Sequence, residues 1–414
     1  MDIPGLPARR AALKLLDAVL RRGETLDQAG HNASQGLVSA ADRAMAKAIA
    51  AEALRWLPDF DALIDSATRQ PLPEDAKPRS VLRLMLAQWL RLGTPPHAVV
   101  ATALPLLAGG PKRLAHGVFA TLTRGGATLP RHPSLPAGVA ERWGTRAEAI
   151  AAALGEPPPL DLTLKEPADT AQWAERLGGT SLLPGHVRLP RGEAVERLDG
   201  FAEGAWWVQD LAASLPARLL GAPHMPDGNH ALDLCAAPGG KALQLAAAGW
   251  EVTAVDASAK RLERLAANFA RVDLPVTTVA ADVLAWEPDA AFDAILLDAP
   301  CTATGTCRRH PDVLHRITPT QVRGMAELQQ QLLARAAQWL KPGGRLVYAV
   351  CSLEPAEGET VAAGLSLPVL PIRADELPAG LAPAAGGWLR TDPGMLAEAG
   401  GLDGFFIARW QAPA

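Results

Sequence analysis

The sequence is poor in cysteine, tyrosine and long apolar runs. It holds four cysteines in 414 residues, at positions 235, 301, 307 and 351, and it has no Cys-x-x-Cys pair. This spacing indicates neither a zinc site nor a disulfide framework, so we expect no metal and interpret each cysteine singly, as a core residue or a nucleophile. Residues 1–10 lack an apolar signal core, and no run of eighteen apolar residues occurs. We therefore expect a cytoplasmic protein without membrane contact.

A large excess of charge of one sign is also absent. The net charge is −4, which argues against a wholly basic nucleic-acid binder. Residues 1–130 nevertheless carry 16 Lys and Arg against 11 Asp and Glu, a net of +5, whereas residues 201–414 carry 16 against 23, a net of −7. If an RNA partner exists, the front of the chain is the better electrostatic candidate, although a solvated helical surface gives the same pattern.

Three segments follow one another along the chain, as its length and its 49% hydrophobic content allow. Residues 1–128 predict an all-helical domain, because apolar residues recur there at helical spacing. Residues 129–200 predict a Pro-rich joint and a small mixed α/β lobe. Residues 201–414 predict a doubly wound, Rossmann-like α/β domain with a parallel sheet. Its expected strands are 231–235, 251–256, 275–280, 292–298 and 345–351, and helices are expected from 241, 258 and 319.

Residues 231–241, Ala-Leu-Asp-Leu-Cys-Ala-Ala-Pro-Gly-Gly-Lys, form the central motif. Small residues between a strand and a helix let the backbone approach a ligand, and the helix start supplies free N–H groups. A Walker A phosphate loop is excluded, because Cys235 and Ala242 stand where Gly and Ser or Thr are required. Asp256 ends the next strand, where doubly wound folds place the acid that binds ribose hydroxyls. The pattern predicts an adenosine cofactor; an ordinary tight turn is the alternative.

Two cysteines follow neighbouring strands of the predicted sheet. Asp298-Ala-Pro-Cys301 ends the fourth strand, and Cys351-Ser352 ends the fifth. Ligands of open α/β sheets bind at this edge, where Asp233, Asp256 and Asp282 also lie at or just past strand ends. A single free cysteine often packs in a core. A pair at adjacent strand ends favours reactive thiols.

These residues carry a family resemblance. The string 233–241, with Asp298-Ala-Pro-Cys301 and Cys351-Ser352, resembles the Sun family of S-adenosyl-L-methionine-dependent RNA cytosine 5-methyltransferases. Residues 91–99 and 114–120 resemble the helical RNA-binding domain related to the antitermination factor NusB. The combination is similar to the RsmB (Sun, Fmu) group, which acts on 16S ribosomal RNA. Residues 313–316 depart from a Lys-Trp pair usual in the family, and Thr302 replaces a usual Ser, which concerns RNA-contacting loops more than the chemistry.

The resemblance implies a catalytic set. Cys351 is the nucleophile that adds to carbon 6 of cytosine, and Cys301 assists release of the enzyme. Addition of a thiolate is needed because carbon 5 is too poor a nucleophile to take a methyl group directly. Asp298 is placed to stabilise charge on ring nitrogen 3. DNA cytosine methyltransferases use the cysteine of the Pro-Cys context as nucleophile instead, so the residues alone leave the two thiol roles exchangeable.

The cofactor S-adenosyl-L-methionine and an RNA partner complete the implied site. The implied cofactor-binding residues are Cys235, Ala236, Ala237, Pro238, Gly239, Gly240, Lys241, Asp256 at the ribose, Asp282 near the adenine and Asp298 near the methyl donor. Arg9, Arg10, Arg308 and Arg309 are candidates for RNA phosphate contacts. We expect a monomer with no obligate protein partner. The alternatives are the same chemistry on transfer RNA or another ribosomal RNA site, methylation of an exocyclic amine, and a non-catalytic NusB-like RNA-binding or assembly factor.

Overall fold

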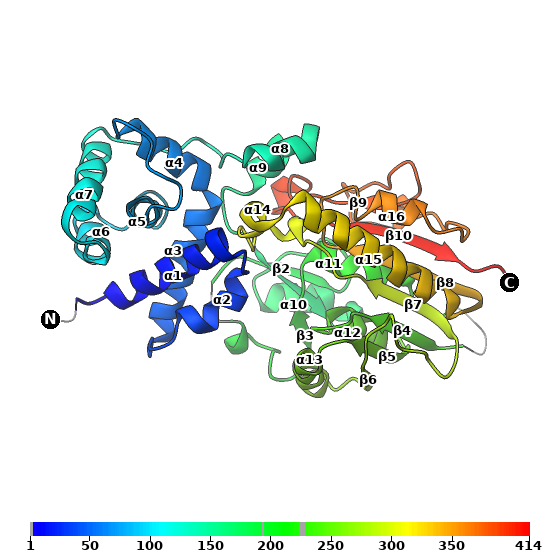
Figure 1. Cartoon of the computed structure of the whole chain (residues 1–414). Helices are drawn as coiled ribbons and strands as arrows, with labels where there is room; N and C mark the ends of the chain where they lie inside the picture. Colours follow the sequence, from blue (N-terminus) through cyan, green and yellow to red (C-terminus); the bar gives the residue numbers. More distant parts are fainter. Residues whose placement is uncertain (1–2, 193, 224–227) are drawn as a thin grey trace. The chain divides into compact units, whose positions relative to one another are not determined.

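The chain forms two compact units in the computed structural model, which describes residues 3–192, 194–223 and 228–414. The first unit comprises residues 1–156 together with 307–317, and the second comprises 157–306 with 318–414 (Figure 1). These boundaries differ from the three predicted segments, because the helices of the predicted joint belong with the front of the chain. Among the described residues, no helix is both long and apolar enough to cross a membrane.

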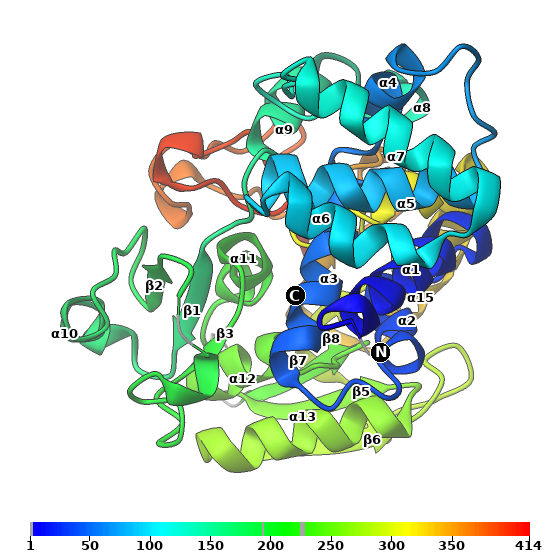
Figure 2. The same ribbon diagram turned by 90° about the vertical axis from the view of Figure 1, so that its left-hand side faces the viewer.

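The first unit is all-helical, which confirms the predicted class of the front of the chain. Its helices are α1 (Leu6–Arg22), α2 (Leu26–Ala33), α3 (Ala40–Arg55), α4 (Leu57–Ser66), α5 (Lys77–Leu86), α6 (Pro96–Ala103), α7 (Gly109–Arg124), α8 (Ala137–Trp143), α9 (Ala147–Ala153) and α14 (Val313–Arg316). One apolar face of each long helix enters a common core that includes Leu16, Ile49, Leu82 and Phe119. Figure 2 shows α1, α3, α5, α6 and α7 packed together around this core.

The second unit is built on a seven-stranded sheet with the order β6-β5-β4-β7-β8-β10-β9. The strands are β4 (His230–Leu234), β5 (Glu251–Asp256), β6 (Val276–Ala280), β7 (Phe292–Asp298), β8 (Leu340–Val350), β9 (Leu389–Arg390) and β10 (Phe406–Gln411). The five predicted strands are present and pair in parallel. The sheet is not wholly parallel, however, because β10 runs antiparallel to both β8 and β9.

Helices cover both faces of this sheet, as the doubly wound prediction requires (Figure 1). Side chains alternate between the faces along each strand. Ala294 and Leu296 pack in one core with α11 (Leu211–Leu220), α12 (Gly240–Ala247) and α13 (Ala259–Val272). Ile295 and Leu297 pack in the other core with α15 (Pro319–Gln338) and α16 (Glu359–Ala363). The apolar run of β7 thus serves two cores, which is typical of a central parallel strand.

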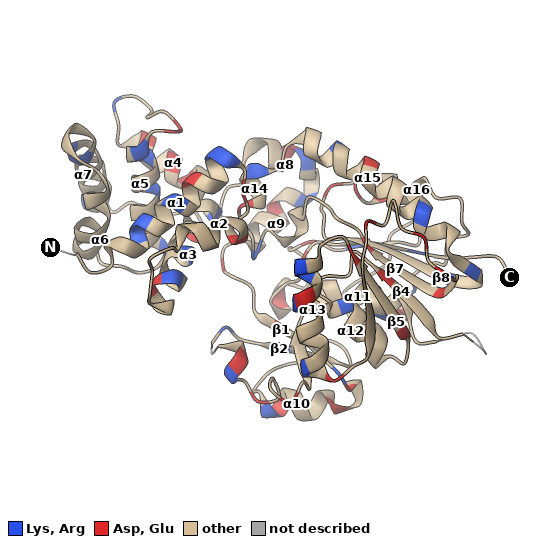
Figure 3. Ribbon diagram, turned by 60° about the horizontal axis from the view of Figure 1, so that its bottom comes forward, with Lys and Arg blue, Asp and Glu red and all other residues tan. Residues whose placement is uncertain are grey.

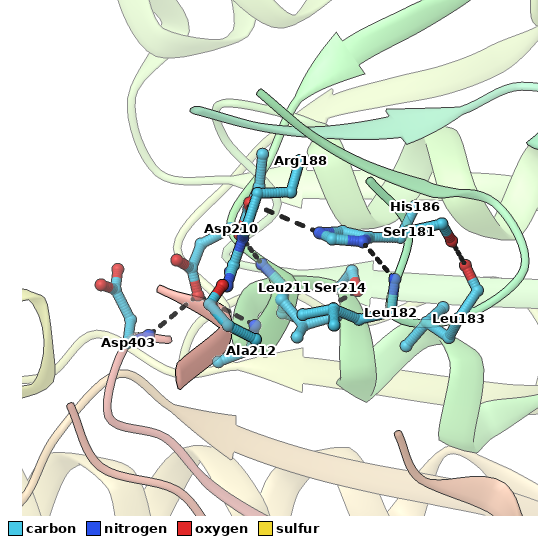
Figure 4. Close-up of polar contacts among 12 residues, drawn as sticks. Ser181, Leu182, Leu183, His186, Arg188, Asp210, Leu211, Ala212, Ser214 and Asp403 are labelled. Carbon is cyan, nitrogen blue, oxygen red and sulfur yellow. Dashed lines mark hydrogen bonds and ion pairs between the residues drawn. The ribbon is translucent and has the colours of Figure 1, made fainter. Parts of the chain in front are cut away.

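A small antiparallel sheet precedes the large one, where the sequence predicts a small mixed lobe. It consists of β1 (Leu160–Leu164), β2 (His186–Leu189) and β3 (Trp206–Val208), with α10 (Thr170–Arg176) against β2. Trp206 and Trp207 are buried, which agrees with core packing rather than base stacking. Figure 4 shows Arg188 and His186 of β2 beside the start of α11, where the Asp161 carboxylate accepts hydrogen bonds from Arg188 and from the Leu211 amide.

Residues 307–317 lie between β7 and α15 in the sequence but pack within the helical unit. The buried Arg55 guanidinium donates to the carbonyl oxygens of Leu154, at 3.0 Å, and Arg308, at 2.9 Å. His315 Nε2 lies 2.7 Å from the carbonyl oxygen of Leu54, and burial lowers the pKa of His315 to about 4. The chain a few residues beyond Cys301, in the loop that begins after β7, therefore forms hydrogen bonds with the helices of the first unit.

Candidate active site

The two predicted thiols lie together at the carboxyl edge of the sheet. Cys301 follows β7 and Cys351 follows β8, and their Sγ atoms are 3.4 Å apart. The loops that carry them also share a backbone hydrogen bond, from the Gly305 amide to the Cys351 carbonyl oxygen at 3.0 Å. Gly305 has no room for a side chain, because an added Cβ would lie 1.9 Å from the carbonyl oxygen of Gly404. The fold thus holds both sulfur atoms at one place.

Cys301 and Lys241 both have raised pKa values at this site. The hydrogen bond to Cys351, together with burial, raises the pKa of Cys301 well above its usual range, so Cys301 is a neutral thiol at physiological pH. Although burial opposes the charged form of Lys241, its pKa is raised by Asp298 and, to a smaller degree, by Asp233 and Cys351. The ammonium group of Lys241 therefore stays charged and attracts negative charge on the sulfur of Cys351.

A buried carboxylate, Glu357, connects the two cysteine loops, and sequence reasoning missed it. It accepts hydrogen bonds from the Thr302 amide at 2.9 Å, from the Thr302 and Ser352 hydroxyl groups, and from Gln329 Nε2 at 3.1 Å. Glu357 does not stand at the carboxyl end of a strand, which is where the other candidate residues were predicted. Only its spacing of six residues from Cys351 hints that it returns to the same loop.

The loop between β4 and α12 has the conformation expected of a nucleotide-binding turn. Cys235 adopts a positive φ of 60° and Gly239 a φ of 106°, so the backbone turns sharply before α12 begins. The Asp256 carboxylate, at the end of β5, accepts from the Ala237 amide at 3.2 Å and from the Ser258 amide at 2.9 Å. Burial is the largest of the effects that raise the pKa of Cys235 to about 12, so its thiol is a packing group.

Acidic groups and the cation of Lys241 lie at the strand ends next to this loop. Lys241 Nζ lies 2.6 Å from Asp298 Oδ2. Asp233 is fully buried, and neither of its carboxylate oxygens has a hydrogen-bond partner among the described residues. Burial, followed by the charge of Asp298, raises the pKa of Asp233 well above its usual range, while the facing amide of Ala242 opposes the rise. An orphaned buried carboxyl group is costly unless a ligand completes its hydrogen bonds.

This donor set fits S-adenosyl-L-methionine, which carries an ammonium group, a sulfonium centre and two ribose hydroxyl groups. Asp233 and Asp298 provide acidic groups for the two cationic centres, and Asp256 provides the ribose acceptor expected at the end of the second strand. The amides at the start of α12 suit the carboxylate of the ligand. Fold and site together define an S-adenosyl-L-methionine-dependent methyltransferase domain.

Comparison with known proteins identifies the family. Residues 222–410 match the model of 16S rRNA methyltransferase RsmB/F, and residues 6–108 match that of the NusB family. The chain is 34% identical to ribosomal RNA small subunit methyltransferase B of Xanthomonas campestris pv. campestris over 98% of its own length and 97% of that protein. The protein of that name from Xylella fastidiosa (strain 9a5c) is 36% identical, with 96% of this chain and 98% of that protein covered. The chain therefore belongs to the RsmB/F family of 16S rRNA methyltransferases, and its cofactor is S-adenosyl-L-methionine.

A solved structure supports the fold over the whole length. The crystal structure of PH0851 superposes with a TM-score of 0.71 at 20% sequence identity and covers 99% of both chains. At this identity the likeness concerns the fold alone.

The remaining predicted site residues are distributed unevenly. Asp282 is exposed just past β6, where its carboxylate accepts from the Leu284 amide at 3.0 Å. Arg10 is exposed, so it presents its charge to solvent, whereas Arg309 is half-buried. Arg9 and Arg308 do not, since they are only 9% and 2% exposed. Their prediction as phosphate contacts is corrected: Arg9 donates to Gln88 Oε1 inside the helical core, and Arg308 is buried in the segment packed against Arg55.

Proposed function

We propose that this protein methylates carbon 5 of a cytosine in 16S ribosomal RNA through a covalent adduct between Cys351 and carbon 6. The observation that carries the proposal is the 3.4 Å separation of two thiols at the edge where the cofactor residues lie. Methylation of an exocyclic amine needs no thiol, and a non-catalytic binding factor has no physical need for two of them beside a charged Lys241–Asp298 pair.

The chemistry assigns a task to each residue. The Cys351 thiolate forms a bond to carbon 6, and the π electrons of the 5,6 double bond move onto carbon 5 and the ring. Lys241 donates a hydrogen bond to Asp298 at 2.6 Å, and this pair stabilises the negative charge that develops at nitrogen 3. S-adenosyl-L-methionine, when bound, would supply an electrophilic methyl group to carbon 5 and leave as S-adenosyl-L-homocysteine. Transfer of the carbon 5 proton to water then restores the double bond, and the sulfur leaves carbon 6 with the electron pair of its bond.

The surroundings of the two thiols support the role of each. The hydrogen bond between the two thiols raises the pKa of Cys301, and the charge of Cys351 is one of those that raise the pKa of Lys241, so the Lys241 cation acts on the proposed nucleophile. A neutral Cys301 thiol at 3.4 Å can donate a hydrogen bond, and finally a proton, to the sulfur of Cys351 as that sulfur departs. This is the form in which we propose that Cys301 assists release of the product.

We further propose that the NusB-like unit contributes RNA contacts. Cationic side chains lie along several of its helices (Figure 3). Arg10 and Lys14 on α1 and Lys112 and Arg113 on α7 are exposed, so their charges are available to phosphate oxygens. With Arg309 they replace Arg9 and Arg308 as candidates. The target cytosine must leave its stack to reach the thiols, which favours a loop or junction of the RNA.

A covalent trap tests the mechanism. Wild type, Cys301→Ala and Cys351→Ala proteins are incubated with S-adenosyl-L-methionine and RNA from cells that lack the gene, and denaturing gels are examined for a protein–RNA band. We expect the band to accumulate with Cys301→Ala and to vanish when Cys351 is also replaced. An adduct that forms in Cys351→Ala and depends on Cys301 would reverse the two roles. Absence of any adduct, with no methyl transfer by wild type, would favour a non-catalytic binding factor. Bisulfite sequencing of the RNA locates the methylated cytosine.

A further inference from the structure

We infer that Glu357 is a positioning residue which sets the distance between the two active thiols. The inference rests on the proposed roles of Cys301 and Cys351. It concerns a side chain that touches neither sulfur atom through a hydrogen bond but binds the residue that follows each of them, Thr302 and Ser352.

The hydrogen bonds of Glu357 account for its whole accepting capacity. A carboxylate offers about four acceptor sites, and here four donors approach it. Oε1 receives the Thr302 amide and Gln329 Nε2, while Oε2 receives the hydroxyl groups of Thr302 and Ser352. Glu357 is fully buried, so water does not substitute for any of these bonds. Loss of the carboxylate would leave the buried Thr302 amide and one N–H of Gln329 without an acceptor.

The four donors come from three parts of the thiol site. Thr302 fixes the loop after β7, and Ser352 fixes the loop after β8. Gln329 comes from α15 and also donates to the Pro300 carbonyl oxygen at 2.8 Å, so it holds the backbone of the Cys301 loop in place. The phenol of Tyr348 donates to the backbone oxygen of Glu357 at 2.6 Å, which ties this residue to β8 itself. A single carboxylate therefore joins the two loops whose relative position decides the separation of the sulfur atoms.

The same hydrogen bonds predict different effects for two substitutions that keep the length of the Glu357 side chain. In Glu357→Gln, the amide oxygen can stay opposite the two N–H donors, and its NH₂ group can donate to the hydroxyl groups of Thr302 and Ser352, which also accept. Glu357→Met has a similar shape but no acceptor for the Thr302 amide or for Gln329. We therefore expect Gln to preserve the separation of the thiols and Met to lose it.

Thiol cross-linking with dibromobimane measures that separation without any RNA chemistry. The reagent becomes strongly fluorescent when neighbouring thiols displace both of its bromides, and peptide mapping distinguishes Cys301–Cys351 links from products of Cys235 and Cys307. We expect Glu357→Gln to cross-link as wild type does, and Glu357→Met to cross-link about tenfold more slowly. Methyl transfer by Glu357→Met should fall about a hundredfold in kcat with an unchanged affinity for S-adenosyl-L-methionine.

Asp293→Leu supplies the matched control. Asp293 is a buried carboxylate at the other end of β7, where it accepts from Lys341 and from the His230 amide. Its replacement should lower the melting temperature while leaving the cross-link intact. Equal cross-linking in Glu357→Met and wild type, or equal loss in Glu357→Met and Asp293→Leu, would overturn the inference. Absence of the adduct in Cys301→Ala, with no methyl transfer by wild type, would instead count against the proposed function, because cross-linking does not depend on that function.

Discussion

Gly239 illustrates how one residue controls the cofactor turn. Its φ of 106° is a conformation that residues with a side chain rarely adopt, and an added Cβ would lie 3.0 Å from Leu265 Cγ. We expect Gly239→Ala to lower the free energy of unfolding by roughly 1–2 kcal/mol, the usual penalty for a left-handed conformation. It should also weaken binding of S-adenosyl-L-methionine, because relief of the strain moves the amides at the start of α12. Urea unfolding and calorimetric titration measure the two effects.

The neighbouring glycine is the control for that prediction. Gly240 is the first residue of α12, and a Cβ there would make only ordinary contact, 3.4 Å from the Gln209 side chain. Gly240→Ala should therefore change stability far less than Gly239→Ala. Equal effects of the two substitutions would show that space in the loop, rather than backbone conformation, is what Gly239 provides.

The residues of the site could be predicted from the sequence only where position along a strand decides their place. Cys301 and Cys351 follow strands whose carboxyl ends share one edge, so their meeting follows from the topology. Glu357 follows no such pattern, because its role comes from a loop that folds back under Cys351. The burial of Arg9 and Arg308 could not be predicted from the sequence either. Exposure depends on which distant segment packs against a side chain, and charge alone carries no information about that.

At the scale of elements, the small sheet depends on a buried ion pair between β1 and β2. Asp161 and Arg188 are paired across the strands, and both guanidinium contacts to the carboxylate are 2.7 Å long. Burial alone would raise the pKa of Asp161, but hydrogen bonds from Arg188 and His186 outweigh it and hold the pKa well below its usual range. A depressed pKa of this kind stabilises the fold at pH values above the unfolded pKa of about 3.9.

This ion pair predicts both a loss of stability and a pH dependence. Asp161→Asn leaves Arg188 without its charged partner in a buried site, which typically costs about 3–5 kcal/mol. The contribution of wild-type Asp161 should begin to decline as the pH falls below about 5 and be lost progressively toward the much lower folded pKa, since the unfolded carboxyl group takes up a proton that the folded group resists. Urea unfolding at pH 7 and at pH 4 measures both. Wild type and variant should differ less at pH 4, and a constant difference would show that the charge of Asp161 does not stabilise the fold.

The observed boundaries of helices and strands agree with the predicted ones where the spacing of apolar residues and the capping or helix-breaking residues indicate the same boundary. The strand from Phe292 to Asp298 begins and ends as expected, and the helix begins at Pro319 as expected, because an apolar run marks the strand and a Thr cap marks the start of the helix. β8 begins at Leu340, earlier than the predicted residue 345, and a register shift occurs where it pairs with the start of β7. The antiparallel β10 was missed as a strand. Strand direction depends on how the preceding loop returns to the sheet, which no local pattern encodes.

At the scale of the whole molecule, the chain leaves the methyltransferase unit after Thr306 and re-enters it at Thr318. Arg55 on α3 anchors the intervening segment, because its buried guanidinium donates to the Arg308 carbonyl oxygen and also pairs with Glu52. The segment contains three trypsin sites, after Arg308, after Arg309 and after Arg316. Arg308 is 2% exposed, so wild type should resist cleavage there unless the segment opens.

Arg55→Met should therefore make residues 307–317, which follow the Cys301 loop, accessible to trypsin. The variant keeps a long apolar side chain but leaves the carbonyl oxygens of Leu154 and Arg308 without their charged donor, at a typical cost of about 1.5–3 kcal/mol for each hydrogen bond. We expect trypsin to cut after Arg308 or Arg309 faster than in wild type, and mass spectrometry of the fragments identifies the sites. Arg43→Met is the control, since Arg43 lies on the same helix and donates to backbone carbonyls at an exposed site. If both variants are cut equally fast at these two sites, general loosening of α3 would explain the cleavage, and Arg55 would not be the specific anchor of the segment.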